Sequence, residues 1–183
     1  MKGENDNVKY RVLSADDLVP QLLDGFDRYQ EVTKCWRKEN GEWVLRDVVF
    51  TEQWGRKELL GLTGDLLGIA RRGGFVCDAE KGGRVVGIAS LDSEFFGSRR
   101  QYLELYNIHV SAENRGKGIG RTLFGMVCDE ARRRGAEKLY ISAHSSAETQ
   151  AFYHAMGCVE AEEYDRKKAD CEPCDVQMEL VLQ

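Results

Sequence analysis

The chain has 183 residues, of which 42% are hydrophobic and 31% charged, and its formal net charge is −5 at pH 7. This composition is typical of one globular domain, here residues 1–183, and no apolar run reaches the roughly 18 residues that suggest a membrane-spanning helix. The acidic balance argues against nucleic acid as a general partner. The polar start Met-Lys-Gly-Glu lacks the apolar core of a signal peptide, so we expect a cytoplasmic protein that is not held in a membrane.

Six cysteines could indicate disulfides or a metal site. The chain is neither small nor recognisably secreted, so reduced thiols are the expected state. Cys171 and Cys174 have the spacing of half a zinc site, but no second pair of ligands accompanies them. We therefore expect no metal.

The chain begins with a predicted strand over residues 8–13, in which apolar and polar residues alternate. Residues 14–17 then offer helix N-cap chemistry. Apolar residues follow at helical spacing, and they predict a helix with Pro20 in its first turns. They are Leu18, Val19, Leu22, Leu23 and Phe26.

A β-hairpin is predicted over about residues 31–50, because Asn40-Gly41 at its middle is the strongest short signal for a two-residue turn. With such a turn Trp36 faces Leu45, and both share one side of the ribbon with Trp43. These side chains either pack on the body of the domain or a partner chain, or they wall a substrate site.

Residues 51–72 predict a helix capped by Thr51, although several glycines weaken it by up to about 1 kcal/mol each. Two strands follow over residues 75–79 and 84–91, joined around Gly82-Gly83. The loop of residues 92–100 contains Phe95 and Phe96, which either cover a ligand or cap the core. We favour the core.

The stretch of residues 102–121 organises the rest of the chain. Residues 102–110 predict a central strand that is apolar on both faces, and a helix begins at Ile119 and ends at Gly135. Between them Gly116, Gly118 and Gly120 remove side chains at alternate positions. Bare amides at a helix N-terminus bind anions, and the basic residues there are Arg115, Lys117 and Arg121.

Residues 139–143 predict a short strand parallel to residues 102–110, since strand, helix and strand in about 40 residues form a βαβ unit. A capping box at residues 145–148 opens a helix that ends at Gly157. Two further strands are predicted over residues 158–166 and 175–182. The fold class is therefore α/β or α+β.

The spacing of the glycines excludes the common nucleotide-phosphate loops. No Walker motif occurs, and the dinucleotide fingerprint fails because Arg121 stands at its third glycine position. The run Arg115-Gly-Lys-Gly-Ile-Gly120 after a strand ending in Ile-His-Val instead resembles the acyl-CoA loop of the GNAT acyltransferase superfamily. Phe152, Tyr153 and Gly157 match a second motif of that family, in which Ser146 replaces the usual asparagine.

The resemblance implies the GNAT fold, a mixed twisted β-sheet with helices on both faces and two splayed central parallel strands. It implies acetyl-CoA as acyl donor, no metal, and transfer to a primary amine of a small molecule or peptide. Homodimers are common in the family, and the hairpin would be an elaboration of it. The cofactor-binding residues it implies are Ile108, His109, Val110, Arg115, Gly116, Lys117, Gly118, Ile119, Gly120, Arg121, Ser146 and Phe152.

Direct attack of an amine on the thioester needs a group that accepts a proton and one that donates a proton to the thiolate. Tyr153 resembles the general acid of the family. Glu104, a carboxylate in an otherwise apolar strand, is the favoured base, because burial would raise its pKa. His144 is the alternative base. His109 has the opposite parity to Glu104 and is a packed strand residue unless a bulge intervenes.

Two other functions stay open. A non-catalytic acyl-CoA sensor or assembly module would keep every cofactor residue and differ at Glu104 and Tyr153. A nucleotide-phosphate binder unrelated to CoA would respond to ATP or NAD instead. The expected surroundings of the acceptor are the hairpin, the glycine-rich helix and the loop of residues 92–100.

Overall fold

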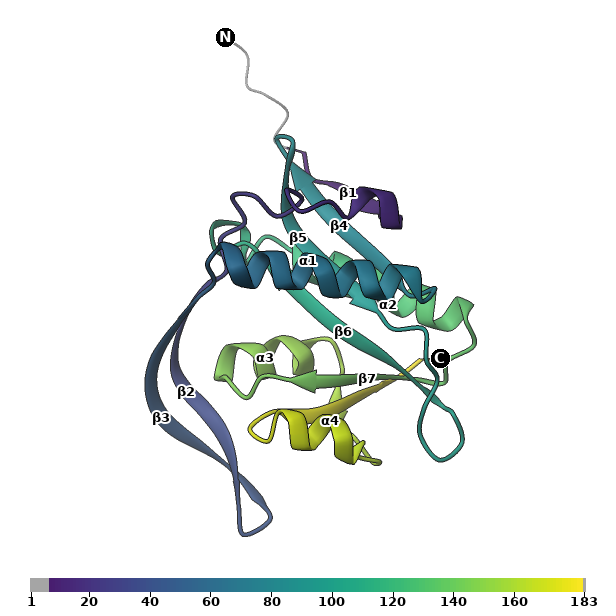
Figure 1. The fold of residues 1–183 in the computed structure, drawn as a ribbon. Helices are drawn as coiled ribbons and strands as arrows, with labels where there is room; N and C mark the ends of the chain where they lie inside the picture. Colours follow the sequence, from purple (N-terminus) through teal and green to yellow (C-terminus); the bar gives the residue numbers. More distant parts are fainter. Residues whose placement is uncertain (1–6, 183) are drawn as a thin grey trace.

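A mixed sheet with the strand order β1-β4-β5-β6-β7-β9-β8 runs through the protein, seen in a computed structural model that describes residues 7–182 (Figure 1). Within the described sheet only β6 and β7 are parallel, and the other neighbouring pairs are antiparallel. A hairpin of β2 and β3 stands beside this sheet. The strands are β1 Lys9–Val12, β2 Tyr29–Glu39, β3 Glu42–Gln53, β4 Phe75–Lys81, β5 Arg84–Leu91, β6 Tyr102–Val110, β7 Lys138–Ala143, β8 Val159–Glu160 and β9 Val176–Val181.

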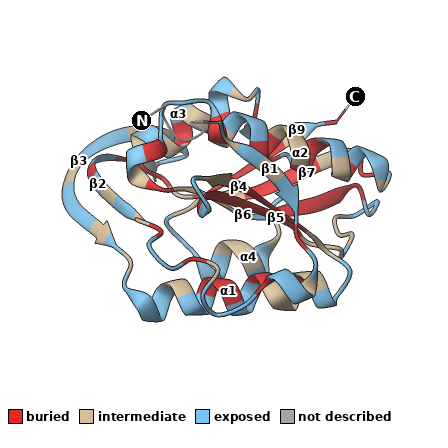
Figure 2. Cartoon of the chain, turned by 90° about the horizontal axis from the view of Figure 1, so that it is seen from above, coloured by how far each residue is buried: buried red, intermediate tan, exposed pale blue. Residues whose placement is uncertain are grey.

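Helices cover both faces of the sheet, as the fold expected from the sequence requires. Figure 2 shows α1 and α4 on one side, and α2 and α3 on the other. Single 3-10 turns lie at Ala15–Asp17 and Ala112–Asn114. The helices are α1 Arg56–Arg71, α2 Ile119–Arg133, α3 Ala147–Ala155 and α4 Arg166–Cys171.

The two faces of the sheet carry separate apolar clusters. Leu66 and Ile69 of α1 pack on Ile88 of β5, whereas Leu123 of α2 packs on the opposite face with Leu103 of β6. Each of these side chains is fully buried or nearly so, and burying one stabilises the fold by about 1.5–3 kcal/mol. Strand β5 contributes residues to both clusters and is thus covered on both faces.

The parallel pair of β6 and β7 stays together only at its start. Residues 102–104 of β6 pair with residues 138–140 of β7, and then the strands part. Beyond this point β6 remains paired with β5, and β7 remains paired with β9. A gap therefore opens between the carboxyl ends of the two strands, which confirms the splayed pair.

A β-bulge in β6 changes which side chains share a face. Ser90 of β5 pairs with Asn107, but the next residue, Leu91, pairs with Leu105, so Tyr106 is an extra residue and is 47% exposed. The bulge reverses the alternation, and His109 lies on the same face as Glu104. The bulge that the sequence analysis required for His109 to share a face with Glu104 is therefore present.

The hairpin turn has the predicted form, with φ of 51° at Asn40 and 86° at Gly41, and Trp36 pairs with Leu45. The ribbon is longer than expected and lies across the start of α3, where the Trp36 N–H donates to the Ser145 carbonyl at 2.8 Å. Trp43 donates its ring N–H to Glu160 at 2.9 Å. The hairpin thus lies on the body of the protein, and the Trp43 side chain packs against the core there.

One predicted helix does not form, and two others are capped differently from the prediction. Residues 18–26 form turns, because Pro20 disfavours helical geometry in the residue before it and Gly25 takes a φ of 80°. Helix α1 begins at Arg56 because Thr51 pairs within the hairpin; Gly55 is its N-cap. The third error concerns α3: Ser146 alone caps it, accepting from the Thr149 N–H at 3.3 Å.

The C-terminal segment also differs from its prediction. The strand expected over residues 158–166 is reduced to the two residues of β8, and α4 follows it. Asp165 caps α4 by accepting from the Lys168 N–H at 3.1 Å, which favours helix at this point. Phe96 packs on Tyr102 and Tyr140, in agreement with the core position favoured for this loop.

Candidate active site

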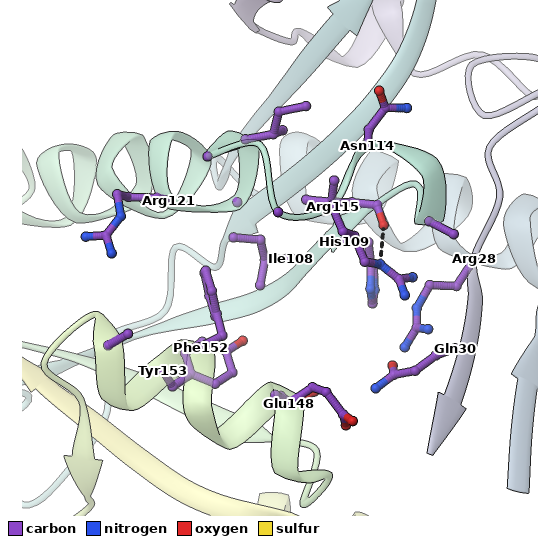
Figure 3. Close-up of a pocket in the computed structure, with 18 of the residues that line it drawn as sticks. Arg28, Gln30, Ile108, His109, Asn114, Arg115, Arg121, Glu148, Phe152 and Tyr153 are labelled. Carbon is purple, nitrogen blue, oxygen red and sulfur yellow. Dashed lines mark hydrogen bonds between the residues drawn. The ribbon is translucent and has the colours of Figure 1, made fainter. Parts of the chain in front are cut away.

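A cavity of about 750 Å³ opens where β6 and β7 have parted (Figure 3). Its walls come from the end of β6, the loop before α2, one face of α3 and the base of the hairpin. Its lining residues are Arg28, Tyr29, Gln30, Glu31, Ile108, His109, Val110, Ala112, Asn114, Arg115, Gly116, Gly118, Ile119, Gly120, Arg121, Glu148, Thr149, Phe152, Tyr153, Ala155 and Met156.

The glycine-rich loop brings backbone amides to this cavity. Gly116 and Gly118 have φ of 71° and 83°, values that side chains rarely tolerate. Gly118 is the N-cap of α2, so the first amides of the helix, which have no acceptor within it, are directed toward the cavity wall. This geometry is suited to binding a phosphate.

Positive charge gathers at the same end of the cavity. The Arg115 Nε donates to the Val110 carbonyl at 3.0 Å, drawn as a dashed line in Figure 3. Burial lowers the pKa of both Arg115 and Arg28 without removing their charge. Within residues 7–182 the buried Nη1 of Arg28 has no hydrogen-bond partner, so it remains free to bind a ligand.

The edge of β6 that faces the gap is also unpaired. The Ser111 N–H donates to the Val86 carbonyl of β5 at 2.9 Å, so the backbone groups of Ser111 point toward β5. Because successive residues of a strand point their backbone groups to alternate sides, those of Val110 and Ile108 face the gap. The Ile108 groups and the Val110 N–H can hydrogen-bond an extended ligand as a further strand would, whereas the Val110 carbonyl accepts from Arg115.

Helix α3 contributes an aromatic wall. Phe152 and Tyr153 stack edge to face with centroids 5.2 Å apart, and Phe124 of α2 supports both rings. Tyr153 is only 6% exposed, and burial raises its pKa above the ordinary value near 10. Its hydroxyl therefore stays protonated at neutral pH and can donate a proton.

A second cavity of about 480 Å³ adjoins the first. The two share Arg28, Ile108, His109, Thr149 and Tyr153. The second is more acidic, and its other lining residues are Glu52, Trp54, Leu105, Tyr106, Asn107, Ser142, His144, Glu172, Pro173, Cys174 and Asp175. A reaction between molecules held in the two cavities would take place beside Tyr153.

Most polar groups of the second cavity already have partners. Glu52 is bound by Arg28 at 3.1 Å and lies 3.7 Å from the Nε2 of His144. The Nδ1 of His144 accepts from the Ser146 N–H at 3.2 Å, so in the neutral ring Nε2 carries the proton. Burial, with Arg28 nearby, lowers the pKa of His109 to about 3, so this ring is neutral.

Asp175 differs from these groups. Burial, followed by a hydrogen bond to Glu172, raises its pKa to about 7. Two carboxyl groups in contact cannot both be charged easily, so Asp175 takes up a proton at a higher pH than a free carboxyl group does. The Ser142 hydroxyl lies 3.5 Å from Glu172 and also interacts with Asp175.

The structure brings together nearly all the residues that the sequence assigned to the cofactor. Lys117 and Ser146 are the exceptions and are not among those lining the described cavities. Lys117 donates to the Glu113 carbonyl at 2.7 Å, and Ser146 is buried as the cap of α3. Tyr153 lines both cavities, and His144 lines the second.

Glu104 is not brought to the site. Among the residues described it lines neither cavity, and its carboxylate is paired with Lys168 of α4. Burial raises its pKa while Lys168 lowers it. Glu104 therefore pairs with the Lys168 ammonium group at the point where β6 and β7 begin to part.

Several lining residues were missed by sequence reasoning. The hairpin contributes Arg28 and Glu52 from its base, whereas the sequence suggested the aromatic residues nearer its tip as site residues. Glu172 and Asp175 lie on either side of Pro173 and Cys174, but the sequence placed Asp175 in a strand and suggested no cavity at this segment. The glycine-rich helix α1 and the loop with Phe95 and Phe96 do not line the second cavity as described.

The cysteines are free thiols: four are buried, while Cys171 and Cys174 are exposed. No group of three or more potential metal ligands occurs among the residues described. Within the same residues no helix is long and apolar enough to cross a membrane.

Comparison with known proteins identifies this architecture. A family model described as "Acetyltransferase (GNAT) family" matches residues 28–158. An uncharacterized N-acetyltransferase of Methanocaldococcus jannaschii is 26% identical over 142 residues, which cover 75% of this chain and 52% of that protein. N-acetyltransferase family 8 member 2 of Rattus norvegicus is 35% identical over 81 residues, 43% of this chain and 36% of that protein. The matched region thus spans about half or less of each relative.

Solved structures agree on the fold. A Bacillus anthracis protein in complex with acetyl coenzyme A superposes with a TM-score of 0.72 at 15% identity, covering 97% of this chain and 99% of that one. A nourseothricin acetyltransferase gives 0.68 at 20% identity, covering 96% and 99%. The ribosomal-protein-S18-alanine N-acetyltransferase of Escherichia coli gives 0.57 at 17% identity, covering 97% and 95%.

Proposed function

Because the chain belongs to the GNAT acetyltransferase family, we propose that it transfers the acetyl group of acetyl-CoA, bound in the first cavity, to a primary amine bound in the second. The observation that carries the proposal is that the two cavities meet at Tyr153. The thioester of a ligand in the first cavity and an amine in the second would both lie beside this hydroxyl.

The residues of the first cavity fit acetyl-CoA. The amides at the start of α2, with Arg115 and Arg121, would hold the pyrophosphate. The backbone groups of Ile108 and the Val110 N–H would hydrogen-bond the amides of the pantetheine arm. Phe152 would pack against the arm from α3. When bound, acetyl-CoA supplies an activated acyl group.

Tyr153 would act as the general acid. The amine attacks the carbonyl carbon, the carbon–sulfur bond breaks, and the sulfur must be met by a proton. A buried phenol with a raised pKa keeps its proton until a strongly basic thiolate forms beside it. The proton lost by the amine nitrogen restores the phenol, so the hydroxyl is unchanged after each turnover.

The acceptor is proposed as a primary amine of a small molecule or a peptide. Proteins with this fold include a nourseothricin acetyltransferase and one named for a ribosomal-protein alanine. An acceptor screen should therefore contain spermidine, kanamycin, lysine and a peptide with a free N-terminus. Release of free CoA thiol reports transfer to any of them.

The first test is thermal unfolding of the purified chain with acetyl-CoA, CoA, ATP or NAD. A ligand at 100 times its dissociation constant stabilises the folded state by about 2.7 kcal/mol. We expect stabilisation by the two CoA compounds. Stabilisation by ATP or NAD without a response to CoA would overturn the proposal.

Turnover is tested with Tyr153→Phe, and with Tyr10→Phe on β1 as the matched control away from the described cavities. We expect Tyr153→Phe to lower kcat about 10²- to 10⁴-fold, the range typical of general acid–base groups, with acetyl-CoA binding retained. Binding of acetyl-CoA without transfer to any amine of the screen would favour an acyl-CoA sensor.

A further inference from the structure

We propose that Asp175, acting with Glu172, is the general base that takes the proton from the acceptor amine. This inference rests on the proposed function and names the residue that completes it. Both carboxyl groups line the second cavity, as does Tyr153. The proton acceptor would then lie beside the reacting nitrogen, and Tyr153 would lie between this nitrogen and the sulfur.

The other candidate bases in the neighbourhood are engaged. Glu104 pairs with Lys168 and is not among the lining residues described. Glu52 is held by Arg28. His144 uses its Nδ1 lone pair to accept from the backbone, so its other nitrogen carries a hydrogen in the neutral ring.

Local geometry explains why the two carboxyl groups meet. The Asp175 N–H donates to the Glu172 carbonyl at 2.9 Å, which closes a turn between α4 and β9. Pro173 inside this turn restricts the backbone. Both side chains are thereby directed to the same cavity, and they hydrogen-bond to each other. When Asp175 takes up one proton, the two carboxyl groups can share it in a hydrogen bond, and one negative charge remains.

The surroundings set the pair to exchange a proton near neutral pH. Burial, the hydrogen bond and charge of Glu172, and the charge of Glu52 on β3 raise the pKa of Asp175, and Ser142 on β7 lowers it. The other titratable groups that line the cavity are Arg28, Tyr106, His109, His144, Tyr153 and Cys174. The Asp175 charge also helps to keep the Tyr153 proton in place.

The proposed step is balanced. An acceptor enters as an ammonium ion and gives one proton to the carboxylate of Asp175, which frees the nitrogen lone pair. The lone pair then forms the bond to the acetyl carbon as the carbon–sulfur bond breaks. The second nitrogen proton passes to the sulfur through Tyr153, and the carboxyl pair releases its proton to solvent.

The test is the pH profile of kcat/KM for the screened amine that reacts fastest, in the wild type and in three variants. Asp175→Asn should lower kcat/KM about 10²- to 10⁴-fold and abolish the acidic limb, while KM for acetyl-CoA stays unchanged. Glu172→Gln should move the acidic limb to lower pH, because a carboxyl partner that raises the Asp175 pKa is gone. Asp170→Asn, an exposed position on α4, should leave the profile unchanged.

A second measurement does not depend on knowing the acceptor. Carboxyl carbon NMR of labelled aspartate should show one group that titrates near pH 7 and is lost in Asp175→Asn. A wild-type spectrum in which no aspartate titrates above pH 6, or an Asp175→Asn enzyme with an intact acidic limb, overturns the inference. Unfolding midpoints and stabilisation by acetyl-CoA verify that each variant is folded.

The failure of this inference can be told apart from failure of the proposed function. If the wild type transfers acetyl groups and Tyr153→Phe is impaired while Asp175→Asn is fully active, only the inference falls. If acetyl-CoA neither binds nor is consumed, the proposed function falls first.

Discussion

Lys168 on α4 forms an ion pair with Glu104 on β6, the last residue of that strand that pairs with β7. Glu104 is only 7% exposed, whereas Lys168 is partly open to solvent. The ammonium group also lies 5.0 Å from the ring centroid of Phe96. The pair therefore ties α4 to the sheet just before the strands part, and it compensates a buried charge.

Replacing Lys168 with methionine should destabilise the fold in a pH-dependent way. Without Lys168 the buried carboxylate of Glu104 has lost its cationic partner. We therefore expect the free energy of unfolding at pH 7.5 to fall by about 1–3 kcal/mol. Burial already raises the folded-state pKa of Glu104, and removing Lys168 raises it further. The penalty should therefore be small below the unfolded-state pKa and should grow as the pH rises through the folded-state pKa.

Urea unfolding between pH 4.5 and 7.5 measures this effect. The double variant Glu104→Gln/Lys168→Met is the control, because it has no carboxylate to titrate at this position. A loss in the single variant that is equal at both ends of the pH range would contradict the prediction.

Two glycines of the α2 segment should respond oppositely to alanine. Gly118 has a φ of 83° at the N-cap, so Gly118→Ala should cost about 1–2 kcal/mol of stability. It should also weaken acetyl-CoA binding, because the loop amides would move. Gly125 lies inside the helix with open space around an added Cβ, so Gly125→Ala should stabilise by up to about 1 kcal/mol. Calorimetric titration measures the affinity of each variant for acetyl-CoA. Equal affinities of the two variants would contradict the prediction.

Chemical modification of the exposed thiols should affect the second cavity and leave the first unchanged. Cys171 and Cys174 should react with an aromatic disulfide reagent in the native protein, whereas buried thiols such as Cys77, whose pKa burial raises to about 12, should react only on unfolding. Cys174 lines the second cavity. Its modification should block transfer while acetyl-CoA still stabilises the protein.

Single serine variants assign this effect. Cys174→Ser should protect activity against the reagent, and Cys171→Ser should not, because Cys171 is not among the residues lining the described cavities. Equal protection by both variants would place the sensitive group elsewhere.

Sequence reasoning predicted the elements whose signals are local. The turn at Asn40-Gly41 determined the register of the hairpin, and the glycine-rich loop between β6 and α2 located the first cavity. The parallel arrangement of β6 and β7 followed from the length of the chain between them. In each case the backbone preference of a few neighbouring residues agreed with the tertiary structure.

The second cavity depended on signals that are not local. The bulge at Tyr106 inserts one residue into β6, and no glycine or proline marks it. Glu172 and Asp175 lie far along the chain from Tyr153, and only the antiparallel pairing of β9 with β7 brings them to the gap. Alternation along a single strand could not show either relationship.

The raised pKa of Asp175 should reduce the stability of the protein at alkaline pH. A carboxyl group whose pKa is about 7 in the folded state and about 3.9 when unfolded binds its proton more tightly in the folded state. Its contribution is therefore fully present below about pH 4 and is lost as the pH rises through about 7. Asp175→Asn, which cannot ionise, should unfold at a higher temperature than the wild type at pH 8 and lose this part of the pH dependence. Asp170→Asn should follow the wild-type curve, and an Asp175→Asn protein that is less stable than the wild type at pH 8 would show that the buried carboxylate is fully compensated.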